Sequence, residues 1–481
     1  MRKFVLSGFC IFNLLIVSDL SAQQAAVDNF VQTKGLEAAN LGVNVVDVKT
    51  GLSVAFYNKN KPLVPASVMK VLTTSTVLEL YGPDYRIPTL LQYSGTIDSD
   101  GVLNGDVYVK GGGDPTLGSE YIDRDKNDFF DACISAIKNA GIRKITGRIV
   151  ADETCFDLEG VSGKWLWEDL GNYFASGSYG ISIYDNAYKL YLKSGKPGEQ
   201  PQILRTDPNV DQIGFYNYLR AEAGNKDSAY IYGIPFAYER WLYGSVPAGR
   251  SEFVIKGDIP DPPYFLADCL NKFLMSAGIS VSEPPVTGRL LDIKNERLVT
   301  DRTLLHTYYS PPLSDIIRHT NVKSDNHYAE HLFKLAALSK YTRASFGNGT
   351  DVILSYWRDR EVYLSGVSLY DGSGLSPSDR LTPQTLTDVL SYMNNISRFA
   401  DSFYASLPVA GVNGTVRAFL KGTKLEGKVH LKSGSINNVQ CFAGYLDKNN
   451  KRYAFCIMAN DYGIPRPTLK KAMEKLLLEL D

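Results

Sequence analysis

The 481-residue sequence has almost no net charge, because 51 Lys and Arg residues stand against 52 Asp and Glu residues. This balance gives no electrostatic reason to expect a nucleic acid or an anionic membrane surface as a partner. Beyond its N-terminus the sequence also has no run of 18 or more apolar residues, which a membrane-spanning helix requires. With 44% hydrophobic residues, the composition is that of an ordinary globular protein.

The first residues, MRKFVLSGFCIFNLLIVSDLSAQQ, have the order of an export signal. Two basic residues precede an apolar stretch from Phe4 to Val17, and small or polar residues follow around Ala22. This order predicts a secretory signal peptide over residues 1–22. Leu20 is large for a position three before a cut after Ala22, which leaves the cleavage site open. We therefore expect a mature protein exported across the inner membrane to the periplasm.

Cysteine is scarce. Of the six cysteines, five remain once Cys10 is removed with the signal peptide. An odd number leaves at least one free thiol or an intermolecular bond, and a chain of this size does not need a disulfide framework. Cys441 and Cys456 fall on what are expected to be neighbouring strands, but their spacing leaves their pairing open.

Hydrophobic periodicity divides the chain into three parts. A hairpin is predicted over residues 41–58, ahead of a helix that begins near Ser67. Residues 87–285 are rich in strand patterns and glycine, with helices predicted near 126–140 and 263–278. Helical patterns return beyond residue 300, before three strand-like runs and a terminal helix, KVHLKSG, QCFAGYL, RYAFCIMAN and RPTLKKAMEKLLLEL. The two ends predict one domain interrupted by an insert too long to be a loop.

The stretch PASVMKVLTTSTVLELYG, residues 65–82, places Ser67 three positions before Lys70. Residues three apart share one face of a helix, so the two side chains could touch. Serine needs an adjacent base to become a nucleophile, and lysine serves as a base when burial or positive charge lowers its pKa. A second Ser-x-x-Lys string, Ser135 to Lys138, lies in an amphipathic helix pattern and is interpreted as a chance match on a solvated face.

Two triplets downstream carry further polar groups. Ser324-Asp325-Asn326 begins a predicted helical stretch, and Lys432-Ser433-Gly434 lies on a predicted strand. An acyl-transfer enzyme needs groups that relay protons and donors that stabilise an oxyanion. Ser-x-x-Lys, Ser-Asp-Asn and Lys-Thr-Gly together are the motifs of penicillin-binding proteins and class A β-lactamases, with serine here in place of the threonine.

The sequence resembles the class C low-molecular-mass penicillin-binding proteins, the D-alanyl-D-alanine carboxypeptidase/endopeptidase family. The resemblance rests on KPLVPASVMKVLTT, GGGDPTL, GSVPAG, IPDPPYFLADCL, VKSDNHYAEHLFK, DGSGLSPSDRLTP, LPVAGVNGTVR and GKVHLKSGS. It implies an α+β, β-lactamase-like catalytic domain, an antiparallel sheet flanked by helices plus a helical subdomain, at residues 23–86 and 298–481. Two smaller β-rich domains would interrupt it, domain II at 87–118 and 240–297 and domain III at 119–239.

The resemblance also implies catalytic roles. Ser67 would be the acylated nucleophile and Lys70 the base that takes its proton. Ser324 would relay a proton towards the leaving amine, and Asn326 would hold the amide of the substrate. Lys432 would face the terminal carboxylate of the substrate, and its positive charge close to Lys70 would favour a neutral base.

Further residues are implied to bind the substrate. The backbone N–H groups of Ser67 and Ser435 would form the oxyanion hole, with Ser433 and Gly434 beside the substrate. The segment GKWLWEDLGNYFASGSYGISIYDN resembles a family loop whose aspartate, here Asp169, meets the free amino end of a diaminopimelate side chain. A carboxylate suits this task, because a charge-assisted hydrogen bond rewards the correct stem peptide. The alternative is that Asp169 only caps the next turn.

The implied activity is the trimming or cleavage of peptidoglycan stem peptides and cross-links, with β-lactams as acylating ligands and no metal or cofactor. Three alternatives compete with it. A β-lactamase would lack the long insert between Lys70 and Ser324. A zinc peptidase could use His327 and His331, which form a His-x-x-Glu-His motif on one helical face. An inactive wall-binding scaffold is disfavoured because all the expected reactive side chains are present.

Two positions depart from the family pattern. Asn413 stands in GVNGT where the family usually has aspartate, and Pro377 follows DGSGLS where many relatives carry an arginine near the substrate. The second departure affects the side-chain preference expected for the stem peptide.

Overall fold

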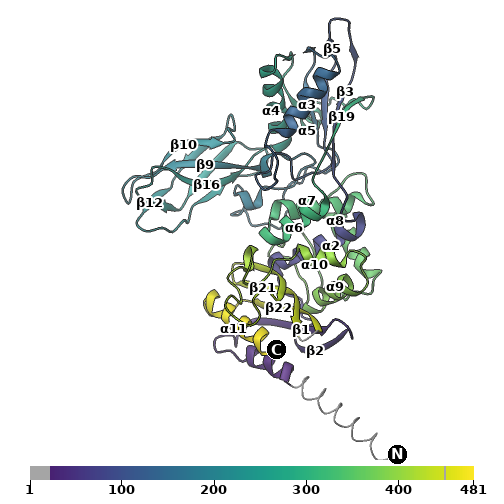
Figure 1. Ribbon diagram of the computed structural model, residues 1–481. Helices are drawn as coiled ribbons and strands as arrows, with labels where there is room; N and C mark the ends of the chain where they lie inside the picture. Colours follow the sequence, from purple (N-terminus) through teal and green to yellow (C-terminus); the bar gives the residue numbers. More distant parts are fainter. Residues whose placement is uncertain (1–21, 449–450, 481) are drawn as a thin grey trace, which may run out of the picture. The chain divides into compact units, whose positions relative to one another are not determined.

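The computed structural model describes residues 22–448 and 451–480 (Figure 1). The predicted signal peptide therefore lies outside the described residues, except for Ala22. The chain divides into two compact units. The first takes in the chain up to Pro83 together with Ile317–Asp325 and Thr350–Asp481, and the second comprises Asp84–Ile316 and Asn326–Gly349.

A five-stranded antiparallel sheet forms the centre of the first unit, in the order β2-β1-β22-β21-β20. Its strands are β1 (Asn40–Asp47), β2 (Leu52–Tyr57), β20 (Val429–Ile436), β21 (Val439–Lys448) and β22 (Lys451–Asn460). The hairpin and the three C-terminal strands predicted from the sequence are confirmed. Because β1 pairs with β22, segments from the two ends of the chain meet in one sheet.

Alternation along the strands gives this sheet two buried faces. On one face, Phe455 of β22 packs in a core with the apolar residues of α11 (Arg466–Glu479). On the other, the side-chain amide of Asn44 donates to the hydroxyl of Thr387 in α9 (Pro383–Asn395), at 2.7 Å. Figure 1 shows α9 and α11 on opposite sides of the sheet.

The helix α2 (Met69–Tyr81) follows a single 3-10 turn, η1 (Ala66–Val68). Its residues from Met69 to Leu78 are all buried, so their hydroxyl groups need partners inside the protein. The indole N–H of Trp357, in α8 (Phe346–Arg358), donates to Thr76 at 2.8 Å. This bond helps to hold α2 in place, and with it the residues that precede it.

The helical pattern predicted beyond residue 300 is interrupted at the Ser-Asp-Asn triplet. The helix α6 (Leu313–Lys323) ends before Ser324, and α7 (Asn326–Leu338) begins two residues later. Ser324 has a φ of 60°, in the left-handed region that few non-glycine residues adopt. Such a conformation persists only where the surroundings hold it, and it is common at functional sites. Periodicity alone does not predict this break.

The second unit contains two sheets built from strands that are distant in the sequence, in the orders β18-β8-β6-β3-β19 and β17-β7-β5-β4. Their strands are β3 (Pro88–Tyr93), β4 (Thr96–Ile97), β5 (Val102–Asn104), β6 (Val107–Lys110), β7 (Lys144–Ile145), β8 (Ile149–Asp152), β17 (Ser280–Val281), β18 (Val286–Thr287) and β19 (Thr303–Tyr309). The strands β7 and β8, which the sequence analysis assigned to domain III, pair with β5 and β6 of domain II. We therefore propose that the boundary between the two inserted domains lies beyond Asp152.

Three helices accompany these sheets: α3 (Asp128–Asn139), α4 (Pro262–Ser276) and α5 (Gly288–Ile293). The first two confirm the helices predicted near 126–140 and 263–278. Phe130 of α3 stacks on Phe273 of α4, with ring centroids 4.6 Å apart, inside a large apolar core. The chance motif at Ser135 lies on α3, as predicted.

The remaining strands of the second unit form smaller sheets, β10-β9-β16, β11-β14-β13 and β12-β15. They are β9 (Ala187–Lys193), β10 (Gln202–Asp207), β11 (Gly214–Asn217), β12 (Arg220–Glu222), β13 (Tyr230–Tyr232), β14 (Glu239–Tyr243), β15 (Ser245–Pro247) and β16 (Phe253–Asp258). A buried ion pair of 2.8 Å joins Arg240 of β14 to Asp258 of β16. It connects two of these sheets.

Within residues 22–448 and 451–480, no helix is both long enough and apolar enough to cross a membrane. All five cysteines in this part of the chain are reduced. Cys441 lies opposite Met458 in the ladder between β21 and β22. Cys456 is two residues before Met458 on β22, so the two cysteines do not face each other directly.

Candidate active site

Ser67 lies in η1, immediately before α2, and the residue is partly exposed. Ala66 before it has a φ of 46°, so the chain turns sharply into this position. Lys70 is completely buried, and its Nζ lies 3.0 Å from Ser67 Oγ. Nζ also donates to the carbonyl of Ser373, at 2.9 Å. The lysine is therefore held facing the serine.

No catalytic role was predicted from the sequence for the loop that carries Ser373. The Asp371 carboxylate accepts hydrogen bonds from the backbone N–H groups of Gly374 and Ser376, at 2.6 and 2.7 Å. Gly374 has a φ of 77°, and a β-carbon there would lie 2.0 Å from the carbonyl oxygen of Ala66, so only glycine permits this approach. In the sequence, the DGSGLS motif marks this loop. A motif of side chains does not show that a backbone carbonyl of the loop contacts Lys70.

Lys432 brings a second lysine into the same cluster. Its Nζ donates to Ser324 Oγ and to the carbonyl of Ser433, each at 2.7 Å. Burial and the positive charge of Lys70 hold the pKa of Lys432 well below its usual range. The structure of the first unit thus gathers Ser67, Lys70, Ser324 and Lys432, which are far apart in the sequence.

The strand β20 lies directly against η1. A β-carbon at Gly434 would lie 2.9 Å from the backbone nitrogen of Ser67, so the glycine allows the strand to approach the serine. Ser435 follows on the strand. The hydroxyl of Ser433 shares a hydrogen bond of 2.7 Å with that of Thr415. The predicted oxyanion donors, the N–H groups of Ser67 and Ser435, therefore belong to two segments that touch.

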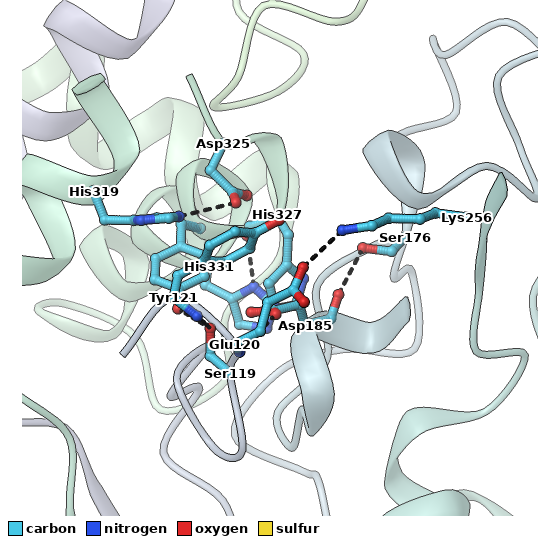
Figure 2. Close-up of polar contacts among 11 residues, drawn as sticks. Ser119, Glu120, Tyr121, Ser176, Asp185, Lys256, His319, Asp325, His327 and His331 are labelled. Atoms are coloured by element: carbon cyan, nitrogen blue, oxygen red, sulfur yellow. Dashed lines mark hydrogen bonds and ion pairs between the residues drawn. The ribbon is translucent and has the colours of Figure 1, made fainter. Parts of the chain in front are cut away.

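The Ser-Asp-Asn triplet distributes its side chains differently. Asp325 lies 3.1 Å from Nε2 of His319 in α6, as Figure 2 shows. Asn326 belongs to the second unit, where its side-chain amide donates to the carbonyl of Phe174 at 2.9 Å. Within the first unit, Ser324 contacts the lysine cluster through its hydrogen bond with Lys432.

Asp169 lies in the second unit, in a loop that Asn172 holds in shape. The side-chain amide of Asn172 donates to the carbonyls of Glu168 and Asp169, and its oxygen accepts the N–H of Ile231 in β13. Among the described residues, no group donates a hydrogen bond to the Asp169 carboxylate, so the turn is capped by Asn172 instead. Burial and, to a smaller extent, the Glu168 charge raise the pKa of Asp169 to about 6.

His327 and His331 are buried in the second unit and bonded to protein groups. The Nε2 of His331 lies 2.7 Å from the hydroxyl of Ser182, and its Nδ1 lies 2.8 Å from the carbonyl of His327, a contact drawn in Figure 2. The Nδ1 of His327 lies 3.1 Å from the carbonyl of Gly177. In the part of the chain that the structure describes, no three His, Cys, Asp or Glu side chains form a metal-binding group. This histidine pair packs α7 against a neighbouring loop.

This site combines the five-stranded sheet, the buried helix α2 directly after Ser67, and two lysines. These features define a class of enzyme, the serine peptidases with a penicillin-binding fold. Residues 23–480 match the model of the D-Ala-D-Ala carboxypeptidase 3 (S13) family, and the chain belongs to this family. It is therefore a serine-type D-alanyl-D-alanine carboxypeptidase with a mixed α+β fold. The family resemblance seen in the sequence is confirmed.

Relatives named as carboxypeptidases match over most of the chain. The D-alanyl-D-alanine carboxypeptidase of Actinomadura sp. (strain R39) is 27% identical, covering 92% of this chain and 81% of that protein. The carboxypeptidase DacB of Haemophilus influenzae is 27% identical, covering 89% and 86%. The crystal structure of penicillin-binding protein 4 (dacB) from H. influenzae superposes with a TM-score of 0.79 at 25% identity, covering 94% of this chain and 98% of that one.

Proposed function

We propose that this enzyme releases the terminal D-alanine from peptidoglycan stem peptides through an acyl-enzyme on Ser67. The observation that carries the proposal is the 3.0 Å contact between Ser67 Oγ and the buried Nζ of Lys70. A serine becomes nucleophilic when an adjacent base can take its proton, and this lysine is the base in contact.

In the first step, Ser67 Oγ bonds to the carbonyl carbon of the penultimate D-alanine while Lys70 takes the hydroxyl proton. The N–H groups of Ser67 and Ser435 stabilise the negative carbonyl oxygen. The C–N bond to the terminal D-alanine then breaks, and the leaving amine takes the proton held by Lys70, relayed through Ser324, which returns Lys70 to its neutral form. Water attacks the ester, giving a proton to Lys70, and Ser67 recovers its proton as the ester bond breaks.

The two lysines favour this sequence electrostatically. Burial and the repulsion between the two lysines lower the pKa of Lys432. The repulsion acts on both members of the pair. A state with one neutral and one charged lysine therefore costs less than a doubly charged state. The terminal carboxylate of a substrate, bound beside Lys432, Ser433 and Gly434, would stabilise the charge on Lys432 and leave Lys70 as the neutral base.

The finer assignments are also proposals. Asn326 holds the amide of the substrate, because it occupies the third position of the Ser-Asp-Asn triplet. Asp169 receives the free amine of a diamino acid, because its carboxylate is half-buried and accepts no hydrogen bond from the described residues. The N-terminal pattern supports export to the periplasm, where cross-links could be cleaved as well as stem peptides trimmed. A penicillin-binding protein 4 of H. influenzae has been solved with a β-lactam, which supports β-lactams as acylating ligands here.

A fluorescent penicillin tests the nucleophile. We expect the label on Ser67, identified by peptide mass, and its loss in Ser67→Ala and in Lys70→Ala. The matched control is Ser135→Ala, which alters the other Ser-x-x-Lys motif on α3 and should label normally. Label on another serine, or undiminished labelling of Ser67→Ala, would contradict the mechanism.

A second assay separates the two peptidase activities. D-alanine release from a soluble pentapeptide measures carboxypeptidase activity, and monomer formation from a purified cross-linked muropeptide measures endopeptidase activity. Both should disappear in Ser67→Ala. Cross-link cleavage that survives this substitution would show a different site.

A further inference from the structure

Aromatic side chains gather on one face of the β11-β14-β13 sheet. Trp241 of the central strand lies opposite Tyr216 of β11 and opposite Tyr232 of β13. Residues opposite one another in a sheet point to the same side. Tyr216 and Trp241 have nearly parallel rings with centroids 5.4 Å apart. These three residues form a first row of rings across the sheet.

A second row runs beside the first. Tyr243 of β14 lies opposite Tyr230 of β13 and stacks on Tyr218, with centroids 5.1 Å apart. Tyr218 directly follows β11, and its N–H donates to the carbonyl of Leu242 at 2.9 Å, which continues the strand pairing. The two rows are two residues apart along each strand and therefore share one face.

The first row is extended by Trp167. Its ring stacks on Tyr232 with centroids 4.7 Å apart, while 72% of the residue remains exposed. Trp167 belongs to the loop that carries Asp169, and the Asn172–Ile231 hydrogen bond fixes this loop to β13. The aromatic face, defined as Tyr216, Tyr218, Tyr230, Tyr232, Trp241, Tyr243 and Trp167, is thus continuous with the proposed substrate loop.

The aromatic face is not part of the core. On the opposite side of the same strands, Ile231, Arg240 and Leu242 are completely buried, while Tyr216 and Tyr218 remain half exposed. A sheet of this kind buries one face and exposes the other, and the exposed one is ordinarily polar. Contiguous exposed aromatic surface of this extent is unusual and marks a site of interaction.

We propose that the aromatic face binds a chain of β-1,4-linked N-acetylated amino sugars. This inference rests on the proposed function, because the glycan strand of peptidoglycan is the polymer that carries the stem peptides. Pyranose rings present C–H groups that pack on the electron-rich faces of Tyr and Trp, while the Tyr hydroxyls and Trp N–H groups can bond sugar hydroxyls and amides. A row of adjacent rings offers such contacts to successive sugars.

The exposed charges around the face are of both signs, with Arg220 two residues after Tyr218, so the face lacks the basic cluster that an anionic lipid surface requires. Glu239 is exposed two residues before Trp241 and so shares its face. Burial and the neighbouring Glu168 carboxylate raise the pKa of Tyr232, which places a second acidic group beside the rings. Acidic groups repel phospholipid headgroups, whereas basic clusters attract them.

Binding of chitohexaose, the β-1,4-linked hexamer of N-acetylglucosamine, to the full-length enzyme tests the proposal by titration calorimetry. We expect Trp241→Ala and Tyr216→Ala to weaken binding by about tenfold or more, as is common for aromatic contact residues. Trp241→Phe keeps a ring and should retain most of the affinity. Tyr309→Ala removes an exposed aromatic residue on β19, outside the aromatic face, and should bind as the unaltered enzyme does.

Two activity measurements separate this proposal from the proposed function. D-alanine release from a soluble pentapeptide should be equal in Trp241→Ala and the unaltered enzyme, while release from intact sacculi should fall. No binding of chitohexaose, or equal binding by Trp241→Ala, would overturn the glycan proposal. Binding to phosphatidylglycerol vesicles in place of the hexamer would also overturn it and indicate a lipid surface. Failure of the unaltered enzyme to act on the pentapeptide would count against the proposed function alone.

Discussion

Replacing Gly434 by alanine tests the contact between β20 and η1. A β-carbon at this position would lie 2.6 Å from the carbonyl oxygen of Pro65 and 2.8 and 2.9 Å from the backbone nitrogens of Val68 and Ser67. All three neighbours are backbone atoms, which cannot turn aside as a side chain can. Restoring ordinary contact requires β20 and η1 to separate by about 0.5–0.8 Å.

We expect the cost of this separation to fall on the proposed oxyanion hole, because its two proposed N–H donors belong to Ser67 and Ser435. Loss of one such donor typically lowers turnover by about 10²–10³-fold, and a misplacement of about 1 Å costs about 10²-fold. We therefore expect kcat/KM for D-alanine release to fall about 100-fold in Gly434→Ala. Penicillin acylation should fall by a similar factor, since it uses the same donors. Overpacking should also lower the free energy of unfolding by about 1–3 kcal/mol.

Stopped-flow acylation by a fluorescent penicillin, together with a thermal melt, measures both effects. Gly347→Ala is the matched control, because a β-carbon there has its nearest neighbour, Ser345 Oγ, at 3.8 Å. It lies in α8, where alanine is favoured over glycine, and it should leave activity unchanged. If Gly434→Ala melts cooperatively and keeps wild-type acylation, the close approach of β20 is not needed for catalysis and our account of the oxyanion hole is wrong.

Three further predictions follow from other parts of the structure. Because Asp169 has a pKa raised to about 6, its carboxylate becomes charged as the pH rises through that value, so KM for peptides with a free diamino-acid amine should fall over this range. Asp169→Asn should remove this pH dependence and leave penicillin acylation intact, and a parallel loss of both activities would show a structural role. Arg240→Ala strips the buried Asp258 of its partner and should lower the free energy of unfolding in urea by about 3–5 kcal/mol, whereas an unchanged midpoint would show that the pair contributes nothing. EDTA should leave D-alanine release unchanged, since both ring nitrogens of His331 are bonded to protein groups, and inactivation by EDTA would reopen the zinc alternative.

Much of the fold could be predicted from the sequence, because helices and strands have a regular spacing of hydrophobic residues. The hairpin β1-β2, the helices α3 and α4 and the three C-terminal strands all follow hydrophobic periodicity. The pairing of β7 and β8 with β5 and β6 was not readable, since strands of two to four residues carry too little pattern to fix a partner far away in the sequence.

The site could be predicted only where side-chain motifs reveal it. Ser67, Lys70, Ser324 and Lys432 were named from their motifs, and the structure brings these four together. The contact of Lys70 with Ser373 is made by a backbone carbonyl, so no pattern of side chains predicts it. The left-handed conformation of Ser324 depends on the surrounding packing, and a helical pattern on both sides conceals it.

The pairing of β1 with β22 has a consequence for biosynthesis. A ribosome produces β1 and the nucleophilic serine early, but the strand that completes the sheet is β22, Lys451–Asn460, and the strand that brings Lys432 and Ser435 is β20, Val429–Ile436. Until those segments emerge, the nascent chain has a serine without its second lysine, without the N–H group of Ser435 and without the sheet that supports them. If these residues act as proposed, the acyl chemistry can begin only when the chain is nearly finished, and we expect a product truncated before Val429 to be inactive.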